Sequence, residues 1–161
     1  IKEIKGRAQN INEGQDFKVI VDYAHTPDSL KSIYETFSNS KIIGVLGNCG
    51  GGRDKWKRKE MAEIADKYCK EAVLTDEDPY DDEPKDIVED MAKHFINIKP
   101  KIIIDRREAI SAAYKIAEKG DVVIITGKGR DQYIMRKNGQ KEKWSDAEVS
   151  KEELKKYKEL V

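Results

Sequence analysis

The sequence predicts an α/β fold, a three-layer Rossmann-like sandwich with a mostly parallel sheet of about six strands and a C-terminal antiparallel hairpin. Two observations lead to this prediction. Short β-branched runs alternate with helical periods, which is the pattern of βαβ units. The strand segments are nearly unbroken apolar runs, which indicates that helices cover both faces of the sheet. Residues 1–161 are expected to form a single domain.

The parallel strands are expected where apolar, β-branched residues cluster, namely at 17–22, 41–47, 72–75, 101–104 and 121–126. The helices between them are expected from apolar residues spaced three or four apart, with these inner faces: Leu30, Ile33, Tyr34 and Phe37; Met61, Ile64, Ala65 and Tyr68; Ile87, Val88, Met91, Ala92 and Phe95; Ala109, Ala112, Ala113 and Ile116. Thr26 and Pro27 are good first residues for the first helix, and Asp105 with Glu108 resembles a capping box.

The C-terminal part of the chain has a different pattern. Residues 132–135 and 141–144 flank Asn138-Gly139, a pair typical of hairpin turns. Because the hairpin lacks a helical crossover, we expect it at an edge of the sheet. Ser150 with Glu153 predicts a capping box at the start of the last helix.

Composition excludes several classes of function. The 31 basic and 31 acidic residues cancel, which argues against a nucleic-acid partner. No apolar run approaches the roughly 18 residues of a membrane span, and the start of the chain has no signal-peptide core, so we expect a cytoplasmic protein without a membrane partner. Only Cys49, Cys69, His25 and His94 could act as soft metal ligands, and their spacing predicts no metal site.

Ligands of open α/β sheets bind beyond the carboxyl ends of the strands, which here are five loops: 22–26, 47–55, 75–83, 105–107 and 127–132. The glycine-rich second loop does not match a P-loop, because Arg53-Asp54 follows Gly52. It is either a tight turn or a set of bare backbone N–H groups near Arg53 that suit a carboxylate or phosphate. The third loop has six carboxylates within residues 75–83 and is either solvated or receives a cationic group.

Five motifs in order resemble the C-terminal domain of Mur ligases, most closely the UDP-N-acetylmuramoyl-tripeptide synthetase type. They cover roughly residues 6–150 and comprise Gly6-Arg7, the segment 21–28 (VDYAHTPD), the glycine loop with Lys57-Arg58, Asp78-Pro79 and Gly127-Lys128-Gly129. The resemblance implies a three-domain cytoplasmic enzyme of peptidoglycan synthesis. In that reaction ATP phosphorylates the carboxylate of a UDP-MurNAc-peptide, and the amine of an amino acid attacks the acyl phosphate.

The same resemblance implies partners and cofactors. In the intact enzyme ATP and Mg²⁺ are held mainly by the central domain, whose P-loop this sequence lacks. We therefore expect an excised C-terminal domain that works beside the N-terminal and central domains of its parent chain. By itself it is expected to be inactive and to hold no cofactor.

The resemblance also assigns residues. Arg7 matches the arginine near the ATP phosphates and is the expected catalytic residue. Asp22 matches the acid that bonds the nucleotide ribose, and His25 lies in the same nucleotide-side motif. Arg53 matches the arginine that binds the carboxylate of the incoming amino acid.

The substrate loops depart from the family pattern. The signature for meso-diaminopimelate, Asp-Asn-Pro-Arg, aligns with Glu77-Asp78-Pro79-Tyr80, so Asp78 and Tyr80 replace the asparagine and the arginine. The last loop is expected to contact the amino acid through Gly127, Arg130 and Asp131. There Arg130-Asp131 replaces the usual His-Glu of the family. The two acids favour a distal ammonium, as in L-lysine, whereas Arg130 would restore a carboxylate clamp for meso-diaminopimelate. A diamino acid is expected, with lysine slightly favoured.

Two alternatives remain open at this point. One is the corresponding domain of a folylpolyglutamate or cyanophycin synthetase, which shares parts of these motifs. The other is a stand-alone nucleotide-binding module, which would explain the missing P-loop without a parent chain.

Overall fold

The computed structural model describes residues 5–52 and 55–161 and confirms the α/β architecture. Its main sheet has the strand order β1-β2-β6-β3-β4-β5. All neighbours pair in parallel except β1, which runs antiparallel to β2. The strands are β1 (Gln9–Asn10), β2 (Lys18–Asp22), β3 (Ile42–Leu46), β4 (Cys69–Leu74), β5 (Lys101–Ile102) and β6 (Val122–Thr126).

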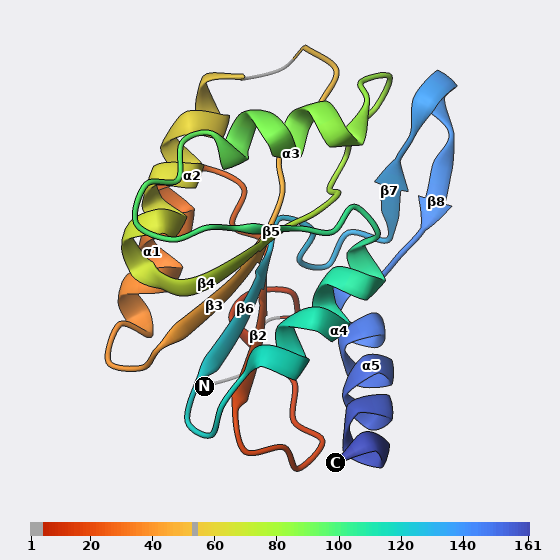
Figure 1. Ribbon diagram of the computed structural model, residues 1–161. Coiled ribbons are helices and arrows are strands. Elements are labelled where there is room, and N and C mark those ends of the chain that lie inside the picture. Colours follow the sequence, from red (N-terminus) through yellow and green to blue (C-terminus); the bar gives the residue numbers. More distant parts are fainter. Residues whose placement is uncertain (1–4, 53–54) are drawn as a thin grey trace.

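Helices cover both faces of the sheet, as the apolar strands predict (Figure 1). They are α1 (Pro27–Thr36), α2 (Trp56–Tyr68), α3 (Pro84–Ala92), α4 (Arg106–Ile116) and α5 (Asp146–Leu160). One core packs α1, α2 and α3 against the sheet, and the other packs α4 and α5 against the opposite face. Along β6, Ile124 contributes to the first core and Val123 to the second, because successive strand residues point to opposite faces.

The predicted start of α1 is confirmed. The Thr26 hydroxyl accepts from the Ser29 N–H, and the Ser29 hydroxyl accepts from the Thr26 N–H, which makes a reciprocal capping box. Pro27 occupies the first turn. Asp105 caps α4 by accepting from the Glu108 N–H. These caps place the helix N-termini directly after strand ends, beside the loops expected to bind ligands.

The C-terminal hairpin differs from its predicted position. Strands β7 (Tyr133–Met135) and β8 (Lys141–Lys143) form a two-stranded sheet of their own and do not extend the main sheet. The turn between them is as predicted, because Asn138 and Gly139 both have positive φ, at 58° and 69°. The edge of the main sheet beside β2 is instead occupied by β1, which was not predicted because it has only two polar residues.

The predicted capping box at Ser150 and Glu153 is wrong. Helix α5 begins at Asp146, and its cap is Ser145, whose hydroxyl accepts from the Glu148 N–H. Ser150 is a buried residue inside the helix. The Ser-x-x-Glu pattern occurs at both places, and the packing of Ala147 and Val149 into the core extends the helix to the earlier one.

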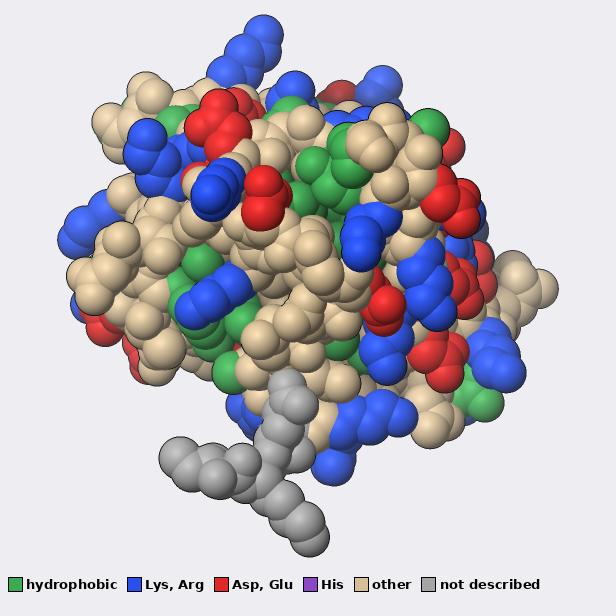
Figure 2. Space-filling model, turned by 90° about the horizontal axis from the view of Figure 1, so that it is seen from below, with side chains coloured by type: hydrophobic (Ala, Val, Ile, Leu, Met, Phe, Trp, Pro, Cys, Tyr) green, Lys and Arg blue, Asp and Glu red, His purple; other side chains and the backbone are tan. Residues whose placement is uncertain are grey.

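The surface follows from the composition. Figure 2 shows Lys, Arg, Asp and Glu side chains interspersed over the face seen from below, with small hydrophobic patches between them. In the part of the chain that the structure describes, no helix combines the length and the apolar character needed to cross a bilayer.

Gly47, at the end of β3, is expected to tolerate no side chain. A Cβ there would lie 2.3 Å from the Thr75 carbonyl oxygen, a backbone atom that cannot rotate away. We expect Gly47→Ala to lower the free energy of unfolding by about 2 kcal/mol, because the two strand ends must separate. Urea unfolding of the chain measures it.

Gly120→Ala is the control for this change. Gly120 has a φ of +85°, and no neighbouring atom lies within 4 Å of the point where its Cβ would be, so the cost is backbone strain alone, about 1 kcal/mol. If Gly47→Ala costs no more than Gly120→Ala, the close approach of β3 and the loop after β4 is not a tight constraint.

Candidate functional site

A cavity of about 480 Å³ lies where the carboxyl ends of β2, β3, β4 and β6 meet. We call it the central cavity. This is the edge at which open α/β sheets bind ligands. Its lining comes from four loops, the start of α2 and the hairpin: Tyr23, His25, Asn48, Cys49, Lys57, Asp78, Tyr80, Lys128, Asp131, Gln132, Tyr133 and Met135.

The acidic loop on one side of this cavity is neutralised by cations of the same chain. Asp78 accepts from Lys128 Nζ at 2.8 Å and from the Met135 N–H at 2.9 Å. The Asp76 carboxylate is bound by Arg136 of the hairpin. The loop therefore anchors the hairpin beside the cavity. Arg136 and Lys128 thus supply cations from the chain itself to Asp76 and Asp78, and the alternative that this loop receives a cationic ligand stays a prediction.

Two protonatable side chains lie close together at the cavity, the buried Glu77 and the half-buried Cys49, which lines the cavity. Burial raises the pKa of the Glu77 carboxyl to about 7, against the opposing effect of Arg106. The Cys49 thiol lies 3.8 Å from Glu77 Oε2. Burial, together with the negative charge of Glu77, raises the pKa of Cys49 to about 12. At neutral pH Cys49 is therefore a protonated thiol and a poor nucleophile.

Of the two alternatives left open for the glycine loop, residues 49–51 fit the tight turn and not the set of bare backbone N–H groups. The Cys49 N–H donates to Asn48 Oδ1, the Gly50 N–H to the Asp78 carbonyl and the Gly51 N–H to Asp82 Oδ2. The bonds of Gly50 and Gly51 tie the glycine loop to the acidic loop. Arg53, the predicted ligand of the amino-acid carboxylate, lies outside the described residues, and its role stays a prediction.

A second cavity, of about 360 Å³, adjoins the first. This side cavity is lined by Lys5, Gly6, Arg7, Tyr23, Arg130 and Asp131, so the two cavities share Tyr23 and Asp131. The Arg7 guanidinium lies over the Tyr23 ring, 5.4 Å from its centroid. Gly6 packs so closely on the Gly129-Arg130 backbone that a Cβ would lie 2.4 Å from the Arg130 nitrogen.

The other residues predicted for the nucleotide side, Asp22 and His25, lie close to this cavity. Asp22 is buried, and its two carboxylate oxygens accept from the Ala8 and Ala24 N–H groups at 3.1 Å each. It thereby holds the segment that carries Arg7. The exposed His25 ring lies 4.5 Å from the Tyr23 ring, centroid to centroid, and lines the central cavity.

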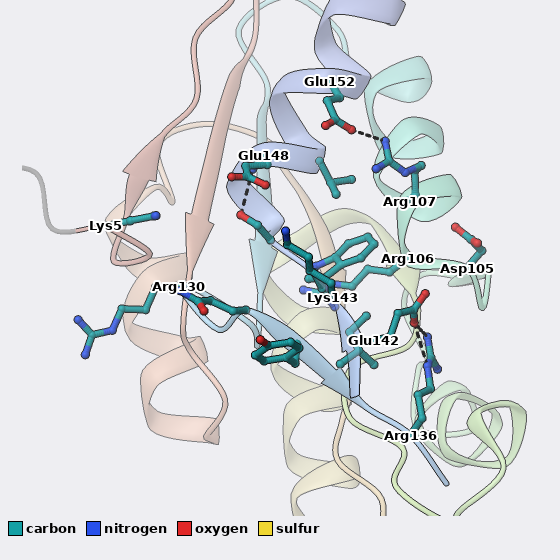
Figure 3. Close-up of a pocket in the computed structure, with 16 residues that line it drawn as sticks. Lys5, Asp105, Arg106, Arg107, Arg130, Arg136, Glu142, Lys143, Glu148 and Glu152 are labelled. Carbon is teal, nitrogen blue, oxygen red and sulfur yellow. Dashed lines mark hydrogen bonds and ion pairs between the residues drawn. The ribbon is translucent and has the colours of Figure 1, made fainter. Parts of the chain in front are cut away.

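A larger cavity, of about 620 Å³, lies between the hairpin and the N-termini of α4 and α5 (Figure 3). It borders the other two, because it shares Lys5 and Arg130 with the side cavity, and Gln132 and Tyr133 with the central cavity. Most arginines there are already paired with acids of the same chain: Arg106 with Asp146, Arg107 with Glu152, and Arg136 with Glu142. Arg130 borders it, and Figure 3 shows its guanidinium directed away from those pairs. We therefore take the two adjoining cavities at the carboxyl edge as the candidate site.

The structure brings most of the predicted site residues together. His25, Asp78, Tyr80 and Asp131 line the central cavity, and Arg7, Arg130 and Asp131 line the side cavity. Gly127 lies against Glu77, where a Cβ would come within 2.1 Å of Oε1. Among the described residues, no three His, Cys, Asp or Glu side chains group closely enough to hold a metal ion.

Lys128 and the hairpin residues of the site were not predicted from the sequence. Lys128 is almost fully buried, with its ammonium between Asp78 and Asp131. Its position between two glycines indicated a close backbone approach and did not reveal the ion pair. Arg130 lines the adjoining side cavity and not the central cavity, and its role as a carboxylate clamp stays a prediction. The preference for lysine assumed acids without a cation, and the pairing of Lys128 with both removes that basis.

The family model described as the glutamate ligase domain of Mur ligases matches residues 6–129. The chain belongs to the Mur ligase family. One relative is the UDP-N-acetylmuramoyl-L-alanyl-D-glutamate–2,6-diaminopimelate ligase of Listeria innocua. It is 43% identical over 137 residues, which are 83% of this chain and 28% of the relative. The protein of the same name from Bacillus licheniformis is 43% identical over 154 residues, 94% of this chain and 31% of the relative. This Mur ligase domain thus spans less than a third of the length of these relatives.

Solved structures agree with this assignment. The structure of a UDP-N-acetylmuramoyl-L-alanyl-D-glutamate–2,6-diaminopimelate ligase superposes with a TM-score of 0.86 at 31% identity, over 98% of this chain and 33% of that one. A bifunctional folylpolyglutamate synthase/dihydrofolate synthase from Yersinia pestis, complexed with AMPPNP and Mn, gives a TM-score of 0.60 at 20% identity over 78% of this chain and 28% of that one. The second likeness shows a shared fold alone, so the relatives favour the Mur branch over the folylpolyglutamate alternative.

Proposed function

We propose that this Mur ligase domain binds the incoming amino acid in an ATP-dependent ligase that extends a UDP-MurNAc-peptide, in the cytoplasm where ATP is consumed. The observation that carries the proposal is the pair of adjoining cavities that share Tyr23 and Asp131. Acyl-phosphate chemistry needs a phosphoryl group and an attacking amine within reach of one carbonyl carbon. A cationic cavity beside a polar one supports this arrangement.

Each cavity has a proposed occupant. Lys5, Arg7 and Arg130 give the side cavity the positive charge that suits ATP phosphates. The central cavity takes a diamino acid, whose two amino groups and carboxylate suit its mixed charges, and the name of the relatives makes 2,6-diaminopimelate the first candidate. The relatives are more than three times as long as this chain, and we assign Mg²⁺, the P-loop and the UDP end to other domains of a parent chain.

The proposed roles within this domain follow from position. Arg7 stabilises negative charge on the transferring phosphoryl group, and Asp22 and His25 support the nucleotide side. Arg53 binds the carboxylate of the amino acid. The site for its side chain is shaped by Asp78, Tyr80, Gly127 and Asp131. Arg130 contributes to the phosphate side.

We expect Arg7→Ala to lower kcat about 100-fold in the full-length ligase, because a charge contact made mainly in the transition state is lost. Phosphate release that depends on both the UDP-MurNAc-dipeptide and the amino acid measures it. Lys31→Ala, an exposed lysine on α1, is the matched control. Wild-type kcat in Arg7→Ala would contradict the assignment of the side cavity to ATP.

A further inference from the structure

Lys128 is a buried ammonium at the boundary of the proposed amino-acid site. Its side chain is only 1% exposed. Lys128 Nζ lies 2.8 Å from Asp78 Oδ1 and 3.5 Å from Asp131 Oδ2, so it joins the loop after β4 to the loop after β6. Both acids line the central cavity. The chain itself therefore places a cation at the point where two carboxylates face the ligand space.

This ion pair changes which ligand group suits the acids. Asp78 is 15% exposed, and besides Lys128 it accepts from the Met135 N–H. A ligand ammonium that approached Asp78 would also approach Lys128 Nζ, and like charges about 4 Å apart repel in a partly buried site. A ligand carboxylate at the same point would instead be attracted to Lys128.

The charge balance around Lys128 supports the same conclusion. Glu77 is buried next to it and is coupled electrostatically to Lys128 and Asp78. Lys57 also lines the cavity. The acids of the site are thus offset by lysines already in place, and they leave little net negative charge to attract a second cation.

We propose that Lys128 is a specificity-determining residue for the far end of the amino-acid substrate. By pairing with Asp78 and Asp131 and halving their combined negative charge, it disfavours a side chain that ends in a lone ammonium relative to one whose end also carries a carboxylate. This inference rests on the proposed function. It assigns selectivity to the ion pair between Lys128, in the loop after β6, and Asp78, in the loop after β4.

The test uses the full-length ligase with two amino acids, L-lysine and meso-2,6-diaminopimelate, and compares kcat/KM for each. We expect Lys128→Met to shift the ratio toward lysine by about tenfold or more, because Asp78 and Asp131 then lack their cation. Lys128→Arg keeps the charge and is expected to keep the ratio. Equal losses for both substrates in Lys128→Met would mean a structural role and overturn the proposal.

A second variant guards against misfolding of Lys128→Met. Asp78→Asn keeps the acceptor oxygen for the Met135 N–H but removes the negative charge, so the ratio should shift toward diaminopimelate by about tenfold. The double variant should return the ratio toward wild type, since acid and cation are lost together. An unchanged ratio in Asp78→Asn also overturns the proposal, whereas a wild-type enzyme that releases no phosphate with either amino acid refutes the proposed function itself.

Discussion

Replacing Arg106 by leucine is expected to lower the free energy of unfolding of the chain by about 3–5 kcal/mol. Arg106 and Asp146 are almost fully buried, with 1% and 0% of their side chains exposed. Arg106 bonds both Asp146 oxygens and also donates to the Asp76 and Thr126 carbonyls, each at 2.8–2.9 Å. Its loss leaves a buried carboxylate without a counter-ion and two carbonyls without donors.

The neighbouring arginine provides a matched control for this measurement. Arg107 is 40% exposed and pairs with the exposed Glu152 and with Glu153, which is buried but is also paired with Lys156. Arg107→Leu should cost less than about 1 kcal/mol, because solvent screens the pair with Glu152 and Lys156 remains as a partner of Glu153. Urea unfolding at constant pH compares the two. Equal losses for Arg106→Leu and Arg107→Leu would contradict the importance of the buried pair.

A double variant separates the charge from the packing. Arg106→Leu with Asp146→Leu removes both charges, and much of the stability should return because no buried ion is left unpaired. Arg106 reaches the ends of β4 and β6, beside Glu77 and Gly127. The remaining difference in free energy of unfolding between the double variant and the wild type then measures how far these strand ends depend on Arg106 as a hydrogen-bond donor.

The difference in free energy of unfolding between Glu77→Gln and the wild type is expected to be about 3 kcal/mol more favourable to the variant at pH 8 than at pH 4. Burial raises the pKa of Glu77 from 4.5 to about 7 in the folded protein. Arg106 and Lys128 face this carboxyl and oppose the shift, whereas Asp78 and Asp146 reinforce it. The folded state therefore prefers the neutral carboxyl.

The sign follows from the two pKa values. Between pH 4.5 and about 7 the unfolded chain ionises Glu77 while the folded chain keeps it protonated, so unfolding releases a proton. The free energy of unfolding of the wild type therefore falls as the pH rises through this window. Above the window Glu77 causes no further loss. Glutamine stays neutral, so the variant lacks this loss.

Urea unfolding of wild type and Glu77→Gln across pH 4–8 measures the difference directly. The exposed Glu60, on α2, gives the control Glu60→Gln, whose difference from wild type should stay small throughout. A difference for Glu77→Gln that stays constant from pH 4 to pH 8 would show that the folded protein does not favour the neutral carboxyl.

Much of this domain can be predicted from local pattern. The parallel strands and the helices α1 to α4 follow from apolar spacing, and Thr26 and Asp105 mark two helix starts because capping depends on residues a few positions apart. The carboxyl-edge rule also locates the ligand site, since parallel strands point their carboxyl ends to one side. The motifs from Gly6 to Gly129 identify the family from sequence order alone.

Other features depend on residues that are distant in the sequence. The position of the hairpin follows from bonds between Asp76 and Arg136 and between Asp78 and Met135, which no local pattern encodes. The choice of Ser145 over Ser150 as the cap of α5 depends on core packing against α4. A two-residue strand such as β1 forms only because the edge of β2 is available to it.

The sequence by itself determined the fold class, the family and the loops that meet at the site, because each depends on local periodicity or on motif order. Only the tertiary structure decided which charges of those loops are already neutralised. Lys128 lies 50 residues from Asp78 in the chain, yet their side-chain atoms are 2.8 Å apart. A carboxylate's chemistry depends on its nearest counter-ion, and that distance is set by how the strands pack.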